Sequence, residues 1–206
     1  MRPLLAAVPF VLLGACSDTT PRTAADSQAA HVAEVAAAGG TVDSIFPIEE
    51  QLRRFRDGLP SVERLRNGAS SRDELVRQFV RAASASDTLT LNRLLLDRAE
   101  FAYLYYPHAA ISKPPYEAPP QILWGQILLA SNEGLPRVLA RAAGQSIDVA
   151  GVTCADSIVV EGPNRLHEKC MLTLRIGKGS AIDTRWFGTI IERDGRFKFL
   201  GYANPL

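Results

Sequence analysis

The chain has 206 residues, of which 47% are hydrophobic and 22% charged, and this is enough to build one globular domain with a buried core. Its 23 basic and 22 acidic side chains leave a formal net charge of +1. A nearly neutral chain offers no basic surface to a polyanion, so we expect no nucleic acid among its partners and no binding to anionic lipid through charge.

The first residues have the layout of an export signal. An apolar run from Leu4 to Leu13 follows Met1-Arg2-Pro3 and is too short to cross a bilayer comfortably. The run ends in Leu13-Gly14-Ala15-Cys16, which resembles the lipobox of bacterial lipoprotein signals, with Cys16 as the cysteine that is modified. The alternative is an ordinary cleaved signal whose small residues happen to precede a cysteine.

The lipoprotein resemblance implies a location for the protein. Residues 1–15 would be removed as a signal peptide, and Cys16 would carry several acyl chains, which are sufficient for stable anchoring without a membrane-spanning helix. Ser17 stands where many enterobacterial lipoproteins of the inner membrane have aspartate. We therefore expect an exported, lipid-anchored protein, with the outer membrane favoured, on its periplasmic side or at the surface.

Residues 16–45 are predicted to form a flexible tether. From Ser17 to about Asp43 the chain contains small and polar residues and almost no large apolar ones. A segment of this composition cannot bury enough surface to offset the entropy lost on ordering. A weak helix around Val32 to Ala38 is the one regular element that we expect there.

Order is predicted to begin at Phe46, with a leading helix and a connection over residues 46–69. Pro47 suits a first helical position, and Gly58 suits the end of the helix. Apolar side chains recur between them at helical spacing, at Ile48, Leu52, Phe55 and Leu59.

Three further helices are predicted. Ser71-Arg72-Asp73-Glu74 is a capping-box sequence that starts an amphipathic helix, and Asp87 to Leu96 forms a second, short helix. Residues 122–143 return to helical spacing, with a break or kink expected at Gly134 to Pro136.

Two segments between these helices are predicted to be non-helical. In the sequence AEFAYLYYP, Phe101, Tyr103 and Tyr105 alternate with other residues, which indicates a strand. His108 to Pro120 is a proline-rich loop, and loops of this length are often lids or binding loops, although many only wrap a surface.

The rest of the chain is predicted to form antiparallel strands. After Ile147 to Cys154 and a strand ending at Val160, three strands are expected over residues 166–176, 184–193 and 196–204. Asp194-Gly195 joins the last two as a tight hairpin turn, which places Ile190 beside Phe199 and Gly188 beside Gly201. One face of this hairpin is the more apolar, and the other is mixed, so it is expected to meet a second element or a partner.

Cys154 and Cys170 lie about equally far from the turn at Gly162-Pro163-Asn164. A hairpin folded at this turn places them opposite each other, on one face with Val152 and Leu172. In an exported protein this arrangement predicts a disulfide bond.

The order of elements predicts an α+β domain in which helices pack on one curved antiparallel sheet. This order, together with the ending GTIIERDGRFKFLGY, resembles the nuclear transport factor 2-like superfamily, which includes ketosteroid isomerase and the SnoaL-like proteins, over about residues 70–206. The resemblance implies a cone-like fold with a pocket under the helices. Because members include isomerases, dehydratases and carriers, it does not choose a function.

No catalytic residue, metal or cofactor is assigned from the sequence. There is no nucleophile elbow or phosphate-binding loop, and the three histidines lack metal-ligand spacing. Asp97, Glu100 and Asp183 cannot be matched to the acidic base of the isomerases; Asp97 is better explained as a turn residue and Asp183 as a hairpin-loop residue.

Two functional hypotheses remain. The first is a non-catalytic module that binds a small apolar ligand or an envelope protein, and the second is a lipid-anchored isomerase, dehydratase or hydrolase. Aromatic side chains could line the pocket, although residues at such spacings are more often core. These candidates are Tyr103, Tyr105, Trp124, Trp186 and Phe199.

Overall fold

The computed structural model describes residues 24–39 and 46–206. The chain divides into a unit that ends at Ile45 and a unit from Phe46 to Leu206. The lipobox and Cys16 lie outside the described residues. Within these residues, no helix is both long and apolar enough to cross a membrane.

The first unit contains helix α1 (Ala24–Ala37). The weak helix expected near Val32 is therefore present, but it begins much earlier than predicted. The helix extends over the alanine-rich stretch because alanine, which buries little surface, is also the best helix former. The role of this segment as a tether stays a prediction.

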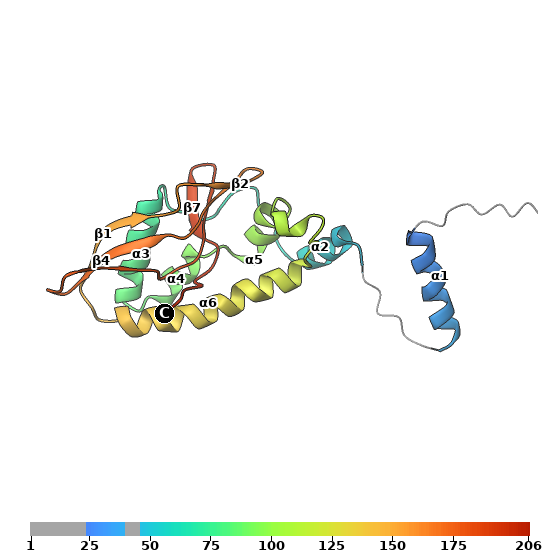
Figure 1. Ribbon diagram of the computed structural model, residues 1–206, viewed down its shortest axis with the longest axis horizontal. Helices are drawn as coiled ribbons and strands as arrows, with labels where there is room; N and C mark the ends of the chain where they lie inside the picture. Colours follow the sequence, from blue (N-terminus) through green and yellow to red (C-terminus); the bar gives the residue numbers. More distant parts are fainter. Residues whose placement is uncertain (1–23, 40–45) are drawn as a thin grey trace, which may run out of the picture. The chain divides into compact units, whose positions relative to one another are not determined.

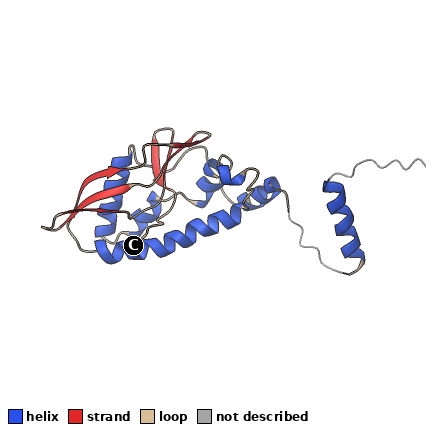
Figure 2. Ribbon diagram, in the orientation of Figure 1, coloured by secondary structure: helices blue, strands red, loops and turns tan. Residues whose placement is uncertain are grey.

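The second unit has the predicted α+β class, with helices and two antiparallel sheets (Figures 1 and 2). Its helices are α2 (Ile48–Arg56), α3 (Arg72–Ser84), α4 (Thr88–Leu94), α5 (Arg98–Glu100) and α6 (Pro120–Ala142), with a π-helical turn η1 (Phe101–Tyr105) and a 3₁₀ turn η2 (Ala110–Ser112). Its strands are β1 (Ile147–Thr153), β2 (Val159–Glu161), β3 (Asn164–His167), β4 (Met171–Ile176), β5 (Ala181–Thr184), β6 (Ile190–Arg193) and β7 (Arg196–Phe199).

The strands form two sheets where one was expected. The orders are β1-β4-β5 and β2-β3-β6-β7. The predicted strand 166–176 is interrupted between His167 and Met171, where Lys169 adopts a positive φ of 52°. The predicted strand 184–193 is also divided, so that its two ends join different sheets. Apolar residues recur on both sides of each break, so the sequence pattern did not indicate that the strand ends there.

The Asp194-Gly195 hairpin is confirmed. Both turn residues have positive φ, at 50° and 68°, as a type I′ turn requires. Ile190 pairs with Phe199, and the Gly188 N–H donates to the Gly201 carbonyl at 3.1 Å. The predicted register is therefore correct from the turn to the two glycines.

The predicted strand at AEFAYLYYP is wrong, because this segment forms α5 and the π-helical turn η1. Asp97 begins it with a reciprocal capping box, in which Asp97 and Glu100 each accept a hydrogen bond from the other's backbone N–H. Phe101, Leu104 and Tyr105 are all buried, so the segment is covered on several sides. Periodicity cannot separate such a helix from a strand.

The other helices lie close to their predicted positions. Ser71 caps α3 by accepting the Glu74 N–H at 3.1 Å, and Asp87 caps α4. Of the break or kink expected in the last helix, the break is wrong, since α6 continues through Pro136 as one helix (Figure 1). A side chain at Gly134 would collide with the Tyr202 carbonyl oxygen, so this glycine permits close packing of the later chain on α6.

Two hydrophobic clusters lie on opposite faces of the β6–β7 hairpin. The first cluster joins α3, the second half of α6 and both sheets; its members include Leu75, Phe79, Val138, Leu172, Leu174, Trp186, Phe187, Ile190, Phe199 and Tyr202. The second cluster joins α2, η1 and the other face of the hairpin; its members include Phe55, Leu65, Leu96, Phe101, Leu104, Tyr105, Tyr106, Leu166 and Ile191. The mixed hairpin face therefore meets a second element of the same chain, as expected.

Candidate functional site

The five aromatic residues proposed as pocket lining divide between the two clusters. Trp186 is 1% exposed and Phe199 is fully buried, and both belong to the first cluster. The Phe199 ring packs edge to face against that of Phe79, with centroids 5.2 Å apart. These two residues are core, which is the alternative that the sequence left open.

The other three candidates lie in or against the second cluster. The Trp124 ring packs 5.1 Å from that of Phe101, and the Arg56 guanidinium lies 4.5 Å from the centre of the Tyr103 ring. Burial raises the pKa of Tyr105 far above its usual value, and the negative charges of Glu161 and Glu168 raise it further. Tyr103 and Trp124 keep partial exposure, so they mark where the second cluster reaches the surface.

A hollow opens between α2 and the proline-rich loop, and none of the five aromatic candidates lines it. Its volume is about 320 Å³. Its lining residues come from three segments: Ile48, Glu49 and Leu52 of α2, Tyr106 and Pro107 after η1, and Ser112, Lys113, Pro114 and Glu117 of the loop. We refer to these residues as the α2–loop hollow. Most of its wall is apolar, with a carboxylate on each side and one ammonium group.

The proline-rich loop is fastened at its base, which gives the hollow a fixed wall. The Tyr106 hydroxyl donates to the Ala118 carbonyl at 2.6 Å, and the Ala118 N–H donates to the Ile111 carbonyl at 3.0 Å. Lys113 Nζ donates to the Pro107 carbonyl at 3.1 Å. The loop is therefore tied to the end of the aromatic segment by both backbone and side chains.

Electrostatics keep the base of the hollow uncharged. Burial raises the pKa of Tyr106 to about 12, and the negative charges of Glu49 and Glu117 add to this effect. Tyr106 is therefore a neutral donor at physiological pH, and its proton is already engaged by Ala118. The charged groups of this site are the exposed side chains of Glu49, Lys113 and Glu117.

A second hollow, of about 650 Å³, lies between α3 and the start of β1. Six of its eleven lining residues have polar side chains: Arg77, Arg81, Ser84, Gln145, Ser146 and Asp148. It is wide and exposed, and it contains none of the aromatic residues singled out from the sequence.

Glu100 forms a buried ion pair that sequence reasoning missed. Its carboxylate is fully buried and lies 2.7 Å from Nζ of Lys198, which is also buried. The same carboxylate accepts hydrogen bonds from the backbone N–H groups of Asp97 and Arg66. These bonds connect the Glu100 carboxylate to Asp97, Arg66 and Lys198 within the fold. Glu100 therefore has a structural role, and its carboxylate is not free to act as a base. The available signal was a lysine between Phe197 and Phe199 in a buried strand.

The other two acidic candidates also have structural partners. Asp97 caps α5 and lies 2.6 Å from an Arg66 nitrogen. Burial opposes its ionisation, but the Glu100 N–H and Arg66 outweigh this effect and lower its pKa. Asp183 accepts a hydrogen bond from the Thr173 hydroxyl at 2.7 Å. The interpretation of Asp183 as a loop residue is wrong, because it lies within β5.

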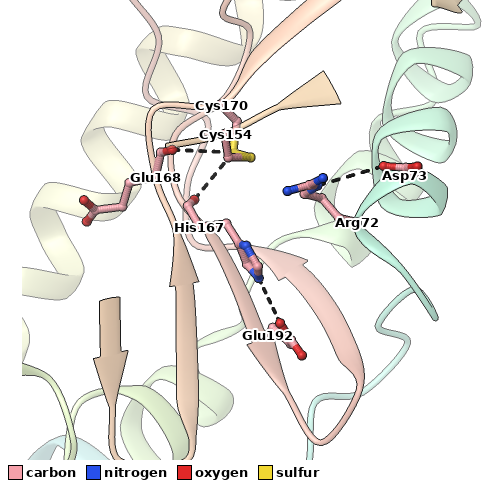
Figure 3. The surroundings of a disulfide bond; sticks show 7 residues. All are labelled: Arg72, Asp73, Cys154, His167, Glu168, Cys170 and Glu192. Atoms are coloured by element: carbon pink, nitrogen blue, oxygen red, sulfur yellow. Dashed lines mark hydrogen bonds and ion pairs between the residues drawn. A yellow bond between two sulfur atoms is a disulfide. The ribbon is translucent and has the colours of Figure 1, made fainter. Parts of the chain in front are cut away.

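Cys154 and Cys170 are within disulfide distance, as predicted (Figure 3). They extend the β1–β4 ladder by one step beyond the pairs Val152–Leu172 and Thr153–Met171. Beside them, His167 Nε2 lies 2.9 Å from a Glu192 carboxylate oxygen. In the part of the chain that the structure describes, no three histidine, cysteine, aspartate or glutamate side chains are grouped so that they could hold a metal ion.

No protein-family model matches the chain, and neither does any curated protein or solved structure. The resemblances to lipoprotein signals and to the nuclear transport factor 2-like superfamily therefore stay predictions. The α2–loop hollow remains as the site in which the predicted aromatic segment and the predicted loop meet.

Proposed function

We propose that the protein is an exported, lipid-anchored binding module of the cell envelope, and that the α2–loop hollow takes a small apolar ligand without covalent catalysis. The observation that carries this proposal is the composition of the hollow. Five of its nine lining residues are apolar or aromatic, namely Ile48, Leu52, Tyr106, Pro107 and Pro114, and its three charged residues, Glu49, Lys113 and Glu117, are exposed. Ligand pockets combine a mostly apolar lining with a few polar groups that fix orientation.

The geometry limits the ligand. A volume of about 320 Å³ is at the small end of the range for ligand pockets. It suits one ring system or a short chain. A polar end on the ligand would meet Lys113 or the carboxylates of Glu49 and Glu117.

The nuclear transport factor 2-like resemblance is also a proposal. The order of α3, α4 and α6 followed by antiparallel strands supports it. Two findings count against it: the aromatic segment is helical, and the strands form two sheets. The binding proposal does not depend on it.

The proposal is tested by filling the hollow. Leu52→Trp should abolish binding of an uncharged fluorescent probe such as Nile red, because the larger ring occupies the space between α2 and the loop. Leu89→Trp is the matched control, since Leu89 is 70% exposed on α4 and is not a lining residue. Unchanged probe binding in the Leu52 variant, at an unchanged melting temperature, would contradict the proposed site. Turnover of a hydrophobic ketone or ester that is lost on removing one carboxylate would support an enzyme instead.

The lipid anchor is tested separately. Cys16→Ser should stop maturation of the signal and prevent incorporation of labelled fatty acid, because it removes the thiol that is acylated. Equal labelling of the variant and the natural chain would refute Cys16 as the anchor.

A further inference from the structure

We infer that the amino-terminal half of α6 lies against the membrane surface, as a second and weaker contact beside the lipid anchor. This inference rests on the proposed lipid anchor at Cys16. Residues 118–132 contain no aspartate, glutamate, lysine or arginine, although they form half of a long surface helix. A solvent-facing helix surface of a soluble protein normally carries charge.

The outward side of this half-helix is uncharged and carries apolar side chains beside the exposed Gln121, Gln126 and Asn132. Ile122 is 55% exposed and Leu129 is 60% exposed, and they lie two turns apart on one side of the helix. Gly125 lies between them and has no neighbouring atoms within contact distance of the position that a side chain would take. We call the surface formed by Ile122, Gly125, Leu128 and Leu129 the α6 patch.

Further exposed apolar side chains occur in the segments beside the α6 patch. Phe46 precedes α2, and Ile111 and Tyr116 belong to the loop before α6. Gln51 of α2 lies 3.4 Å from Gln121 of α6, which places α2 beside the start of that helix (Figure 1). Six of the eleven large apolar side chains that are exposed therefore lie in the α6 patch or in these adjacent segments.

The covalent path of the chain selects a bilayer as the occupant. The segment that follows Cys16 enters the second unit at Phe46, at the end that carries the α6 patch. An anchor at Cys16 thus holds this end near the membrane. Because tethering raises the effective concentration of the α6 patch at the bilayer, even a weak apolar contact is formed for much of the time. An uncharged apolar surface suits the interface of a bilayer irrespective of its lipid charge.

The two tryptophans provide the test. Trp124 lies on the half-helix that carries the α6 patch, and Trp186 is buried in the first cluster. The full chain, purified from the membranes of the producing cells, would be reconstituted into phosphatidylethanolamine and phosphatidylglycerol vesicles with brominated acyl chains. Bromine quenches only nearby tryptophans, so we expect quenching of the natural chain and its loss in Trp124→Phe.

Substitutions in the patch should reduce this quenching without releasing the protein. Ile122→Gln combined with Leu129→Gln should lower quenching about twofold, while sedimentation with the vesicles is unchanged. Val159→Gln combined with Val160→Gln is the matched control, because this pair is also exposed and lies on β2. Equal quenching of the patch variant and the natural chain would overturn the inference and leave the anchor intact. Failure of the natural chain to sediment would refute the anchor and, with it, the inference.

Discussion

The two faces of the β6–β7 hairpin bury apolar side chains by different means. On the face toward the first cluster, Ile190 and Phe199 meet other apolar side chains. On the face toward the second cluster, Ile191 shares the buried space with Lys198 and its partner Glu100. The first face is stabilised by apolar packing. The second combines packing with a buried charge pair, and removal of either member would leave the other charge buried without a partner.

Removing one member of that pair should therefore have one of the largest effects on stability. Lys198→Met leaves the Glu100 carboxylate buried without its cation, and we expect a loss of about 3 to 5 kcal/mol in the free energy of unfolding. Urea denaturation measures this loss. Adding Glu100→Gln removes the unpaired charge, so the double variant should be more stable than Lys198→Met. Additive losses would show that the two side chains do not act as a pair.

The tryptophans compare a filled core with a cluster that reaches the surface. Trp186→Ala should cost about 3 to 5 kcal/mol, because it creates a cavity in the first cluster. Trp124→Ala should cost only about 1 to 2 kcal/mol, because that ring is already partly exposed. Urea denaturation of both variants decides the matter; similar losses would mean that Trp124 is as deeply structural as Trp186.

The disulfide adds a covalent constraint to the first cluster only. Replacing Cys154 and Cys170 together by serine should cost about 3 kcal/mol, given their separation of 16 residues. Protein isolated from the envelope should show neither residue alkylated before reduction and both alkylated afterwards, by intact mass. Alkylation without reductant would show that the bond does not form.

His108, beside the second cluster, should give the smallest effect. Burial lowers its pKa, and the positive charges of Arg193 and Lys113 add to this effect. The folded state therefore resists protonation: stability is full above the ordinary pKa of 6.5 and decreases as the pH falls below it. Thermal melts between about pH 7 and pH 5 should show this decrease, and His108→Gln should reduce it. An unchanged pH dependence in that variant would assign the effect to another group.

The first cluster was largely predictable from the sequence, and the second was not. The Asp194-Gly195 turn determined how the hairpin residues pair, and period-two alternation placed Ile190 with Phe199 on the opposite face from Ile191. The same alternation rule wrongly predicted a strand from Phe101 to Tyr106, because this segment is buried on several sides and its sequence shows no clear period. The Glu100–Lys198 pair joins residues 98 positions apart, and no local pattern encodes such a contact.

The candidate site was predicted in its parts but not in its arrangement. The proline-rich loop was predicted as a possible lid or binding loop, and it does line the hollow. None of the five aromatic residues predicted as pocket lining does so; Tyr106, which was not among them, contributes from the aromatic segment. The opposite wall comes from α2, which sequence reasoning assigned to a leading segment outside the domain. Helix spacing shows that Ile48 and Leu52 share a face, but not which element covers that face.

The close approach of α6 to Tyr202 has a consequence for the order of folding. Gly134 lies against the Tyr202 carbonyl, Ser131 Oγ accepts the Tyr202 N–H at 3.0 Å, and Asn204 donates to the Gly134 carbonyl at 3.0 Å. These contacts join α6 to residues that come after the last strand. During synthesis, α6 leaves the ribosome long before the segment that it must receive. The domain therefore cannot close around α6 while it is being made, and folding must wait for a contact between distant parts of the chain.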